Sequence, residues 1–441
     1  MNLPEAFELQ MKSLLGEAGF LRYLAALSEP PARGLRPNLR FCAPEAGARF
    51  GTEPIPWAPG FFVEAGARPG LSPLHEAGAF YLQEPSAMVP AALLGAQPGE
   101  RVLDLCAAPG GKSTQLADAM RGRGLLLCNE PSPTRAQVLS RNLERMGVGN
   151  ALVVSCLPEA LAPRFEAYFD RILVDAPCSG EGLFRRQPEA MAQWDAQAPA
   201  RCAQRQQGIL GEAARMLRPG GTLVYSTCTF NAVENEQVVR AFLRDHPDFA
   251  PVPFALPGLR PAPEGMLHLY PHEMRGEGHF VCRMRRAGDA PELSCAAPQG
   301  ARDVPLPEVF APGREPMGVW RENGLLFLPP EGYEPRRLAG LPVLRCGLIV
   351  GREKGRRVEP DHALAMALRP EDAARRAELT GEQALLYQAG EALFLGDLPP
   401  GYTLLTHEGR ALGWGKQAGG MMKNHYPKGL WRRGAHGERG E

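Results

Sequence analysis

Between residues 100 and 286, short apolar runs alternate with longer segments in which apolar residues recur at helical spacing. The short runs are rich in Val, Leu and Ile and are too brief for helices, so each predicts a buried β-strand. These runs are 101–108, 124–130, 151–156, 169–177, 221–229 and 278–285. Helices are predicted between them at 133–147, 200–217 and 233–246. This alternation indicates a doubly wound α/β fold with a largely parallel sheet.

The flanking regions have other patterns. Residues 3–28 have helical apolar spacing, and the Pro- and Gly-rich sequence after them predicts irregular structure. Near the other end, short strand-like runs surround one expected helix, 359–378; the runs are 324–330, 343–351, 391–398 and 411–417. We therefore predict five segments, which are 1–98, 99–286, a linker at 287–304, 305–384 and 385–441.

The amino-acid composition excludes few classes of protein. The chain has 441 residues, 44% of them hydrophobic and 22% charged, with no net charge, as in many multidomain globular proteins. No apolar run approaches the ~18 residues that cross a bilayer, and the first residues lack the apolar core of a signal peptide. The ten cysteines form no C-x2-C pair. We therefore expect no metal, no membrane contact and reduced thiols in a cytoplasmic protein.

The first candidate for chemistry is the loop "DLCAAPGGKST" at 104–114, directly after the first predicted strand. An ATP-binding P-loop would need glycine where this chain has Cys106, and the dinucleotide pattern G-x-G-x-x-G is also absent. Small residues still allow the backbone to approach a ligand at this strand end. Glu130 ends the next predicted strand, where an acid can accept hydrogen bonds from ribose hydroxyls. Together they predict a nucleoside site without a phosphate requirement, which suits S-adenosylmethionine.

Two cysteines follow predicted strands into polar loops. Cys178 comes after Asp175 and Pro177, and Cys228 comes after Thr227. The carboxyl ends of parallel strands form the ligand-binding edge of such a sheet, so both thiols are expected there. A thiolate that adds to C6 of cytosine makes C5 nucleophilic enough to attack a sulfonium methyl group. A second group must then help to release the adduct. These residues alone leave open which cysteine attacks.

The motifs "DLCAAPGGKST", "NEPSPTR", "DAPCSGEG" and "YSTCTFNAVENE" give the chain a specific resemblance. Over roughly residues 75–286 it resembles the RNA 5-methylcytosine methyltransferases of the Nol1/Nop2/Sun family. The segments "SGEGLFRRQPEAMAQW", "GREKGRRVEPDHALAMAL" and "GWGKQAGGMMKNHYPKGLWR" are similar to its bacterial small-subunit (16S) rRNA methyltransferase F branch. The resemblance implies a Rossmann-like, seven-stranded methyltransferase core at 99–286. It also implies RNA-binding flanks at 1–98 and 305–384, and a PUA-like RNA-binding domain at 385–441.

The resemblance also implies roles for individual residues. Cys228 should be the nucleophile, Cys178 the releasing group, and Asp175 a partner for the N3/N4 edge of the cytosine. Lys112 should lie near the cofactor tail and the target base. The S-adenosylmethionine site should include Ala107, Ala108, Pro109, Gly110, Gly111, Lys112, Ser113, Glu130, Arg135 and Asp175. The acid that the family usually has after the third strand is missing in "VVSCLPEAL", which leaves the adenine contact unassigned.

The implied partner is RNA, with 16S rRNA or the small ribosomal subunit as the expected substrate and a monomer as the expected state. Candidate RNA contacts are the basic stretches 30–40, 352–357 and 423–433, the last with Tyr426 and Trp431 among its cations. Two alternatives stay open: a tRNA cytosine methyltransferase, and a non-catalytic RNA-binding ribosome assembly factor that uses the fold as a scaffold.

Overall fold

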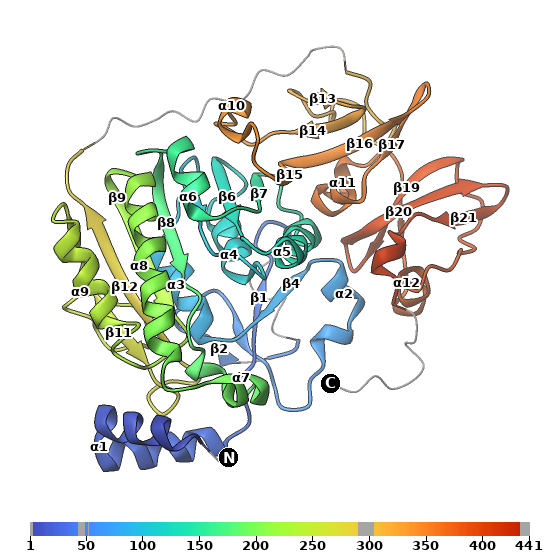
Figure 1. The fold of residues 1–441 in the computed structure, drawn as a ribbon. Coiled ribbons are helices and arrows are strands. Elements are labelled where there is room, and N and C mark those ends of the chain that lie inside the picture. Colours follow the sequence, from blue (N-terminus) through green and yellow to red (C-terminus); the bar gives the residue numbers. More distant parts are fainter. Residues whose placement is uncertain (1–2, 43–48, 52, 290–303, 433–441) are drawn as a thin grey trace.

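The computed structural model describes residues 3–42, 49–51, 53–289 and 304–432. A nine-stranded sheet forms its centre (Figure 1), in the order β10-β12-β9-β8-β5-β6-β7-β15, with β11 paired to β12. The parallel strands are β5 (Arg101–Asp104), β6 (Leu125–Asn129), β7 (Ala151–Val154), β8 (Phe169–Asp175) and β9 (Leu217–Thr227). The antiparallel strands are β10 (Phe249–Pro251), β11 (Met266–Leu269), β12 (His279–Arg286) and β15 (Val343–Cys346).

This sheet confirms the predicted α/β fold, and each of the six predicted strands of the core overlaps an observed one. The seven strands from β10 to β7 correspond to the expected core. Strands β11 and β15 enlarge it, and β15 comes from the part of the chain beyond the predicted linker.

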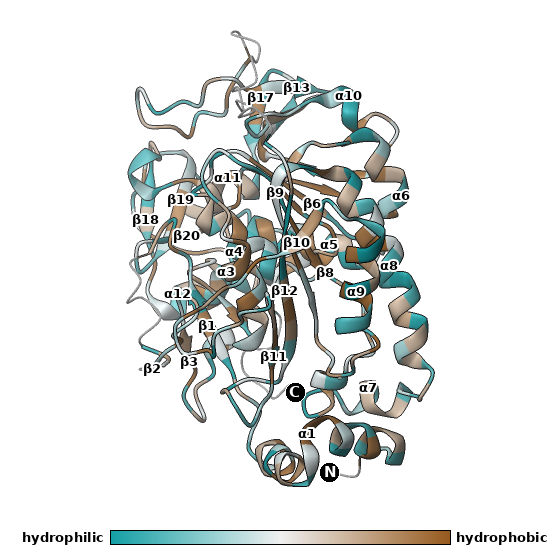
Figure 2. Cartoon of the chain, turned by 90° about the vertical axis from the view of Figure 1, so that its left-hand side faces the viewer, coloured by the Kyte–Doolittle hydropathy of each residue, from teal (hydrophilic) through white to brown (hydrophobic). Residues whose placement is uncertain are grey.

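Helices cover both faces of the sheet, which lies as a largely apolar layer between them (Figure 2). Helices α3 (Val89–Leu94), α4 (Gly111–Ala119) and α5 (Pro133–Arg145) pack on one face. Helices α6 (Pro158–Leu161), α8 (Ala198–Met216) and α9 (Glu236–Asp245) pack on the other. Successive strand residues face opposite sides, so Val102 belongs to the first core and Leu103 to the second.

The N-terminal region is more regular than the sequence predicts. Helix α1 (Glu5–Ser28) is where its apolar spacing places it, and Gly16 interrupts it with a positive φ. Residues 29–98, expected to be irregular, contain α2 (Pro73–Glu76) and a small sheet of β2 (Glu53–Pro54), β3 (Phe61–Phe62), β1 (Gly34–Pro37) and β4 (Phe80–Gln83), in that order. Strands of two to four residues are too short to leave a periodic pattern in the sequence.

Two smaller sheets follow the central one. The first contains β13 (Trp320–Glu322), β14 (Leu325–Leu328), β16 (Leu348–Lys354) and β17 (Arg357–Pro360), with α10 (Pro335–Leu338) and α11 (His362–Ala367) nearby. The second contains β18 (Arg376–Glu378), β19 (Gly401–His407), β20 (Arg410–Ala418) and β21 (Met421–Asn424), with α12 (Gly381–Gln388). The predicted boundary at 384–385 falls within α12, between two strands that share this sheet.

Two expectations for this region are wrong. The helix expected at 359–378 is only α11, because a strand occupies its first residues and Pro370 starts a separate short turn. The run 391–398 forms no strand and contributes one isolated bridge, Leu393 to Met422. None of the described helices is long and apolar enough to cross a lipid bilayer.

Candidate active site

The loop between β5 and α4 is held between two other elements. The backbone N–H of Ala107 donates to the carbonyl of Asn129 at 2.9 Å, which ties the loop to the end of β6. Gly110 has a φ of +110°, a conformation that residues with a Cβ rarely adopt. A Cβ on Gly111 would lie 3.2 Å from atoms of Tyr81 and Gln83 on β4. The glycines therefore let the loop turn sharply and let β4 pack directly against it.

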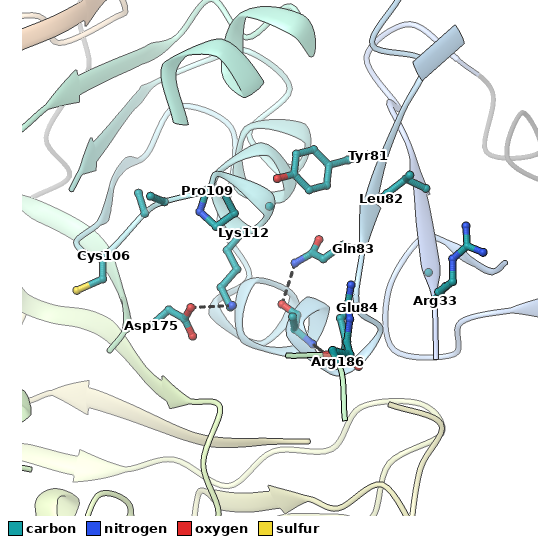
Figure 3. Close-up of a pocket in the computed structure, with 15 residues that line it drawn as sticks. Arg33, Tyr81, Leu82, Gln83, Glu84, Cys106, Pro109, Lys112, Asp175 and Arg186 are labelled. Carbon is teal, nitrogen blue, oxygen red and sulfur yellow. Dashed lines mark hydrogen bonds and ion pairs between the residues drawn. The ribbon is translucent and has the colours of Figure 1, made fainter. Parts of the chain in front are cut away.

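A cavity of about 320 Å³ opens beside this loop. Its walls include six of the residues predicted to bind the cofactor: Ala107, Ala108, Pro109, Gly111, Lys112 and Asp175. Figure 3 shows Tyr81 and Gln83 on the opposite side of the cavity from Cys106 and Asp175. Arg33, Tyr81, Gln83 and Cys106 also line the cavity, and none of them was assigned to the cofactor from the sequence. Arg33, Tyr81 and Gln83 lie in the small N-terminal sheet or next to it, far from the loop in sequence.

Lys112 and Asp175 form a partly buried ion pair in the wall of this cavity (Figure 3). Lys112 Nζ lies 2.8 Å from Asp175 Oδ2, and Ser226 Oγ donates to Asp175 Oδ1 at 2.7 Å. Burial alone would raise the pKa of Asp175, but the Lys112 charge and these hydrogen bonds outweigh it and lower the pKa. Burial likewise opposes the charge on Lys112, and Asp175 outweighs it, with a smaller contribution from Cys228, so its pKa is raised. Both groups stay ionised at neutral pH.

Three other predicted residues support the loop from outside the cavity wall. Glu130 is buried, lies 3.1 Å from Arg135 as an ion pair and accepts a hydrogen bond from the N–H of Ser132 at 3.0 Å. Arg135 also donates to the carbonyl of Ala108 at 3.1 Å. Ser113 is fully buried, and its hydroxyl donates to Asp104 Oδ2 at 2.7 Å. These contacts fix the loop at the ends of β5 and β6.

The residues present fit S-adenosylmethionine. The cavity volume is within the usual range of small-molecule sites. A loop of small residues lets backbone groups approach a ligand there, and the buried Glu130 carboxylate ends the neighbouring strand. Asp104 Oδ1 is buried and has no hydrogen-bond partner among the described residues. The chain would hold this cofactor through the loop 107–113, with the carboxylate of Asp175 in the cavity wall.

The two predicted thiols lie in contact. Cys178 Sγ is 3.1 Å from Cys228 Sγ, and the Cys228 N–H donates to Cys178 Sγ at 3.3 Å. Both side chains are partly accessible and neither is in a disulfide. The hydrogen bond with Cys228, together with burial, raises the pKa of the Cys178 thiol. The Cys178 thiol therefore keeps its proton at neutral pH.

A buried carboxylate holds the two cysteine loops together. Glu234 is fully buried and accepts hydrogen bonds from the Ser179 N–H at 2.9 Å, from the Ser179 hydroxyl, and from the side chains of Gln206 at 2.9 Å and Asn231 at 2.8 Å. Ser179 follows Cys178, and Asn231 lies three residues beyond Cys228. The sequence motif "NAVENE" contained this residue, but spacing alone did not assign it a role.

A second buried carboxylate links these loops to the N-terminal helix. Glu181 accepts hydrogen bonds from the N–H groups of Phe230 at 2.8 Å and Asn231 at 3.1 Å, and from the side chain of Asn231 at 3.0 Å. Gln10 on α1 donates to the same carboxylate at 3.0 Å. The helix therefore contacts the loop that follows Cys228.

One ring expected to stack on RNA bases is buried. Tyr426 is 4% exposed and packs against His362 and Tyr387 in the core of the last sheet, so its ring is not available to a base. Trp431 is partly buried and packs over Gly390, and RNA contact by the basic residues of this stretch stays a prediction. Among the described residues no group of His, Cys, Asp or Glu could hold a metal ion.

The fold and the site together define a Rossmann-like, S-adenosylmethionine-dependent methyltransferase with two adjacent thiols. Within that class, the chain belongs to the 16S rRNA methyltransferase RsmB/F family, whose family model matches residues 91–285. Three domains described for RsmF also match: its N-terminal domain at 3–85, its first C-terminal domain at 308–368 and its PUA domain at 374–433. These matches confirm the family resemblance, the cofactor and the enzymatic class expected from the motifs.

Relatives match along the whole chain. Ribosomal RNA small subunit methyltransferase F of Erwinia tasmaniensis is 34% identical over 98% of this chain and 97% of its own length. The protein of the same name from Escherichia coli K12 is 33% identical with the same coverage. A methyltransferase homologue from Pyrococcus horikoshii has a similar crystal structure, with a TM-score of 0.55 and 30% identity over 64% of this chain and 95% of that one. NSun6 from the same organism, solved with SFG, shares the fold at a TM-score of 0.57 and 20% identity, over 65% of this chain and 99% of that one.

Proposed function

We propose that the chain methylates C5 of cytosine in small-subunit ribosomal RNA through a covalent bond between Cys228 and C6 of the base. The observation that supports this most is the 3.1 Å contact between Cys178 and Cys228 beside the Lys112–Asp175 pair. The relatives named for small-subunit ribosomal RNA cover almost the full chain, which favours that substrate over tRNA.

Each side chain has a distinct part in the proposed reaction. The Cys228 thiolate bonds to C6, and the electron pair of the C5–C6 double bond makes C5 nucleophilic. The ionised Asp175 accepts a hydrogen bond from the N4 amino group on the N3/N4 edge of the ring and so holds the base in place for the addition. When bound, S-adenosylmethionine supplies an electrophilic methyl group. Lys112 keeps Asp175 ionised and oriented.

Release of the product requires the C6–S bond to break. A base removes the C5 proton, the C5–C6 double bond re-forms, and Cys228 leaves as a thiolate. The Cys178 thiol, which retains its proton, lies in contact with that sulfur and stabilises its departure by hydrogen bonding. Cys178 therefore acts in release and Cys228 in attack.

The base must be unpaired, or flipped out of its stack, before two sulfurs and a methyl donor can reach it. We assign RNA binding to the regions around the methyltransferase core, including the PUA-like part, and expect a monomer that works in the cytoplasm. The division of the chain at 98, 286, 304 and 384 is part of this proposal.

The test uses RNA tritiated at C5 of cytosine. With purified protein and the methyl donor, small-subunit ribosomal RNA or small subunits should release tritium, and the Cys228→Ser variant should release none. Release from tRNA alone would identify a tRNA enzyme instead. RNA binding without release from any of these substrates would support a non-catalytic assembly factor.

A further inference from the structure

We propose that the RNA strand carrying the target base lies in a groove beside the cofactor cavity, and that Arg33 and Arg186 bind its phosphates next to that base. The proposal rests on the proposed function, and it identifies the surface of this chain that positions the substrate strand.

The groove has a volume of about 1160 Å³. Its walls are formed by the C-terminal end of α1 and the turn after it, by residues 63–66, by Arg185 and Arg186, and by residues 271–276. Arg33 and Arg186 line both this groove and the cofactor cavity, so the two spaces adjoin at these side chains. Asp175, the proposed partner of the target base, lines the same cavity, so we place the phosphates next to that base near this junction.

Arg33 and Arg186 differ from the other arginines of the groove because they are not paired with a carboxylate of the described residues. Arg185 is held by Glu277 at 2.7 Å and by the carbonyl of Ala26 at 2.6 Å, and Arg275 is paired with Glu53 at 2.5 Å. In contrast, the Arg33 and Arg186 guanidinium groups are exposed and make no hydrogen bond or ion pair with any side chain in the described ranges. An exposed, unengaged guanidinium at the mouth of a site suits bidentate contact with a phosphate.

Acidic residues elsewhere in the groove limit the number of phosphates that it can bind. Glu29, Glu64 and Glu273 also line it, and carboxylates repel a polyanion. We therefore expect few phosphate contacts on this face, concentrated where Arg33 and Arg186 meet. The groove positions the strand locally, and most of the binding free energy comes from elsewhere on the protein.

The test compares Arg33→Gln, Arg186→Gln and the double variant with Arg240→Gln. Arg240 is an exposed arginine on α9, which packs on the other face of the sheet. Affinity for a single-stranded RNA that contains the target cytosine is measured from low to high salt. Each phosphate contact on single strands contributes about 0.7 to the slope of log affinity against log salt. Each groove variant should lower the slope by about that amount, the double variant by about twice as much, and Arg240→Gln should not change it.

Charge-preserving variants and the affinity for S-adenosylmethionine test the same two contacts. Arg33→Lys and Arg186→Lys should restore most of the salt slope, because a charge remains. An unchanged slope in the double variant, or a loss of S-adenosylmethionine affinity larger than the loss of RNA affinity, would overturn the proposal. Binding needs no turnover, so this result is separate from failure of the proposed function, which would appear as wild-type protein that releases no tritium.

Discussion

Cys178 Sγ lies 3.1 Å from Cys228 Sγ although the two residues are 50 positions apart in the sequence. The register of the sheet explains the contact. Strands β8 and β9 are parallel neighbours in which Asp175 is paired with Ser226, so the residues just beyond each strand meet at one edge. The arrangement brings the two sulfur atoms into contact, with the protonated Cys178 thiol next to the sulfur of Cys228.

The first prediction separates the roles of the two thiols. Cys178→Ala should accumulate a covalent complex with RNA, because the departing Cys228 sulfur loses its hydrogen-bond donor. Cys228→Ala should form no complex. Denaturing gel electrophoresis of protein incubated with RNA and methyl donor measures both. A covalent complex with Cys228→Ala and none with Cys178→Ala would reverse the assignment.

The second prediction concerns oxidation of the same pair. Hydrogen peroxide should take two electrons and two protons from the thiols, join Cys178 to Cys228 as a disulfide and itself become water. Methyl transfer should then stop and return after treatment with dithiothreitol. Mass spectrometry of the peptides detects the link.

Cys178→Ala serves as the control, because its Cys228 should progress to higher oxides that dithiothreitol does not reverse. Inactivation of the wild type without the disulfide would contradict the prediction.

The third prediction tests Glu234 as a positioning residue. Glu234→Gln keeps the size of the side chain but removes the charge that accepts hydrogen bonds from Ser179, Gln206 and Asn231. A displacement of one sulfur by about 1 Å can lower a rate by about 100-fold. We expect kcat to fall by about 10- to 100-fold and the peroxide-driven disulfide to form more slowly.

The disulfide rate reports on the distance between the thiols, which overall stability does not. Glu236→Gln is the matched control, because Glu236 is two residues away and accepts a hydrogen bond from His268 instead. Equal disulfide rates in the wild type and the Glu234 variant would show that Glu234 has only a structural role.

Much of the central fold was predictable because its strands and helices are long enough to leave a periodic pattern. The loop 104–114 and the two cysteines could also be placed, since parallel strands present their carboxyl ends at one edge. The N-terminal sheet could not, because its strands have two to four residues. The helix expected at 359–378 was predicted too long, because helical apolar spacing continues past Pro370 in the sequence. A helix cannot continue through that proline without losing a backbone hydrogen bond.

The site itself was predicted only in part. Motif residues such as Lys112 and Asp175 line the cavity as expected, whereas Arg33 and Tyr81, which also line it, were not assigned to the cofactor site. Glu130 and Ser113 hold the loop in place, and their expected contact with the cofactor stays a prediction. Contacts between elements that are distant in sequence depend on tertiary packing, and the spacing of apolar residues along the chain does not predict them.

The last prediction concerns Asp104, whose carboxylate is fully buried at the end of β5. Burial raises its pKa to about 7, and the hydrogen bond from Ser113 offsets this only in part. The native state therefore keeps a proton that the unfolded chain loses near pH 4. The stability from this protonated carboxyl is fully present below about pH 4 and is lost as the pH rises to about 7, by up to roughly 4 kcal/mol. Asp104→Asn has no such titration, so the free energy of unfolding of the wild type relative to the variant should decrease across this window. Urea unfolding at several pH values measures the difference, and a constant difference from pH 4 to 7 would show that Asp104 is ionised throughout.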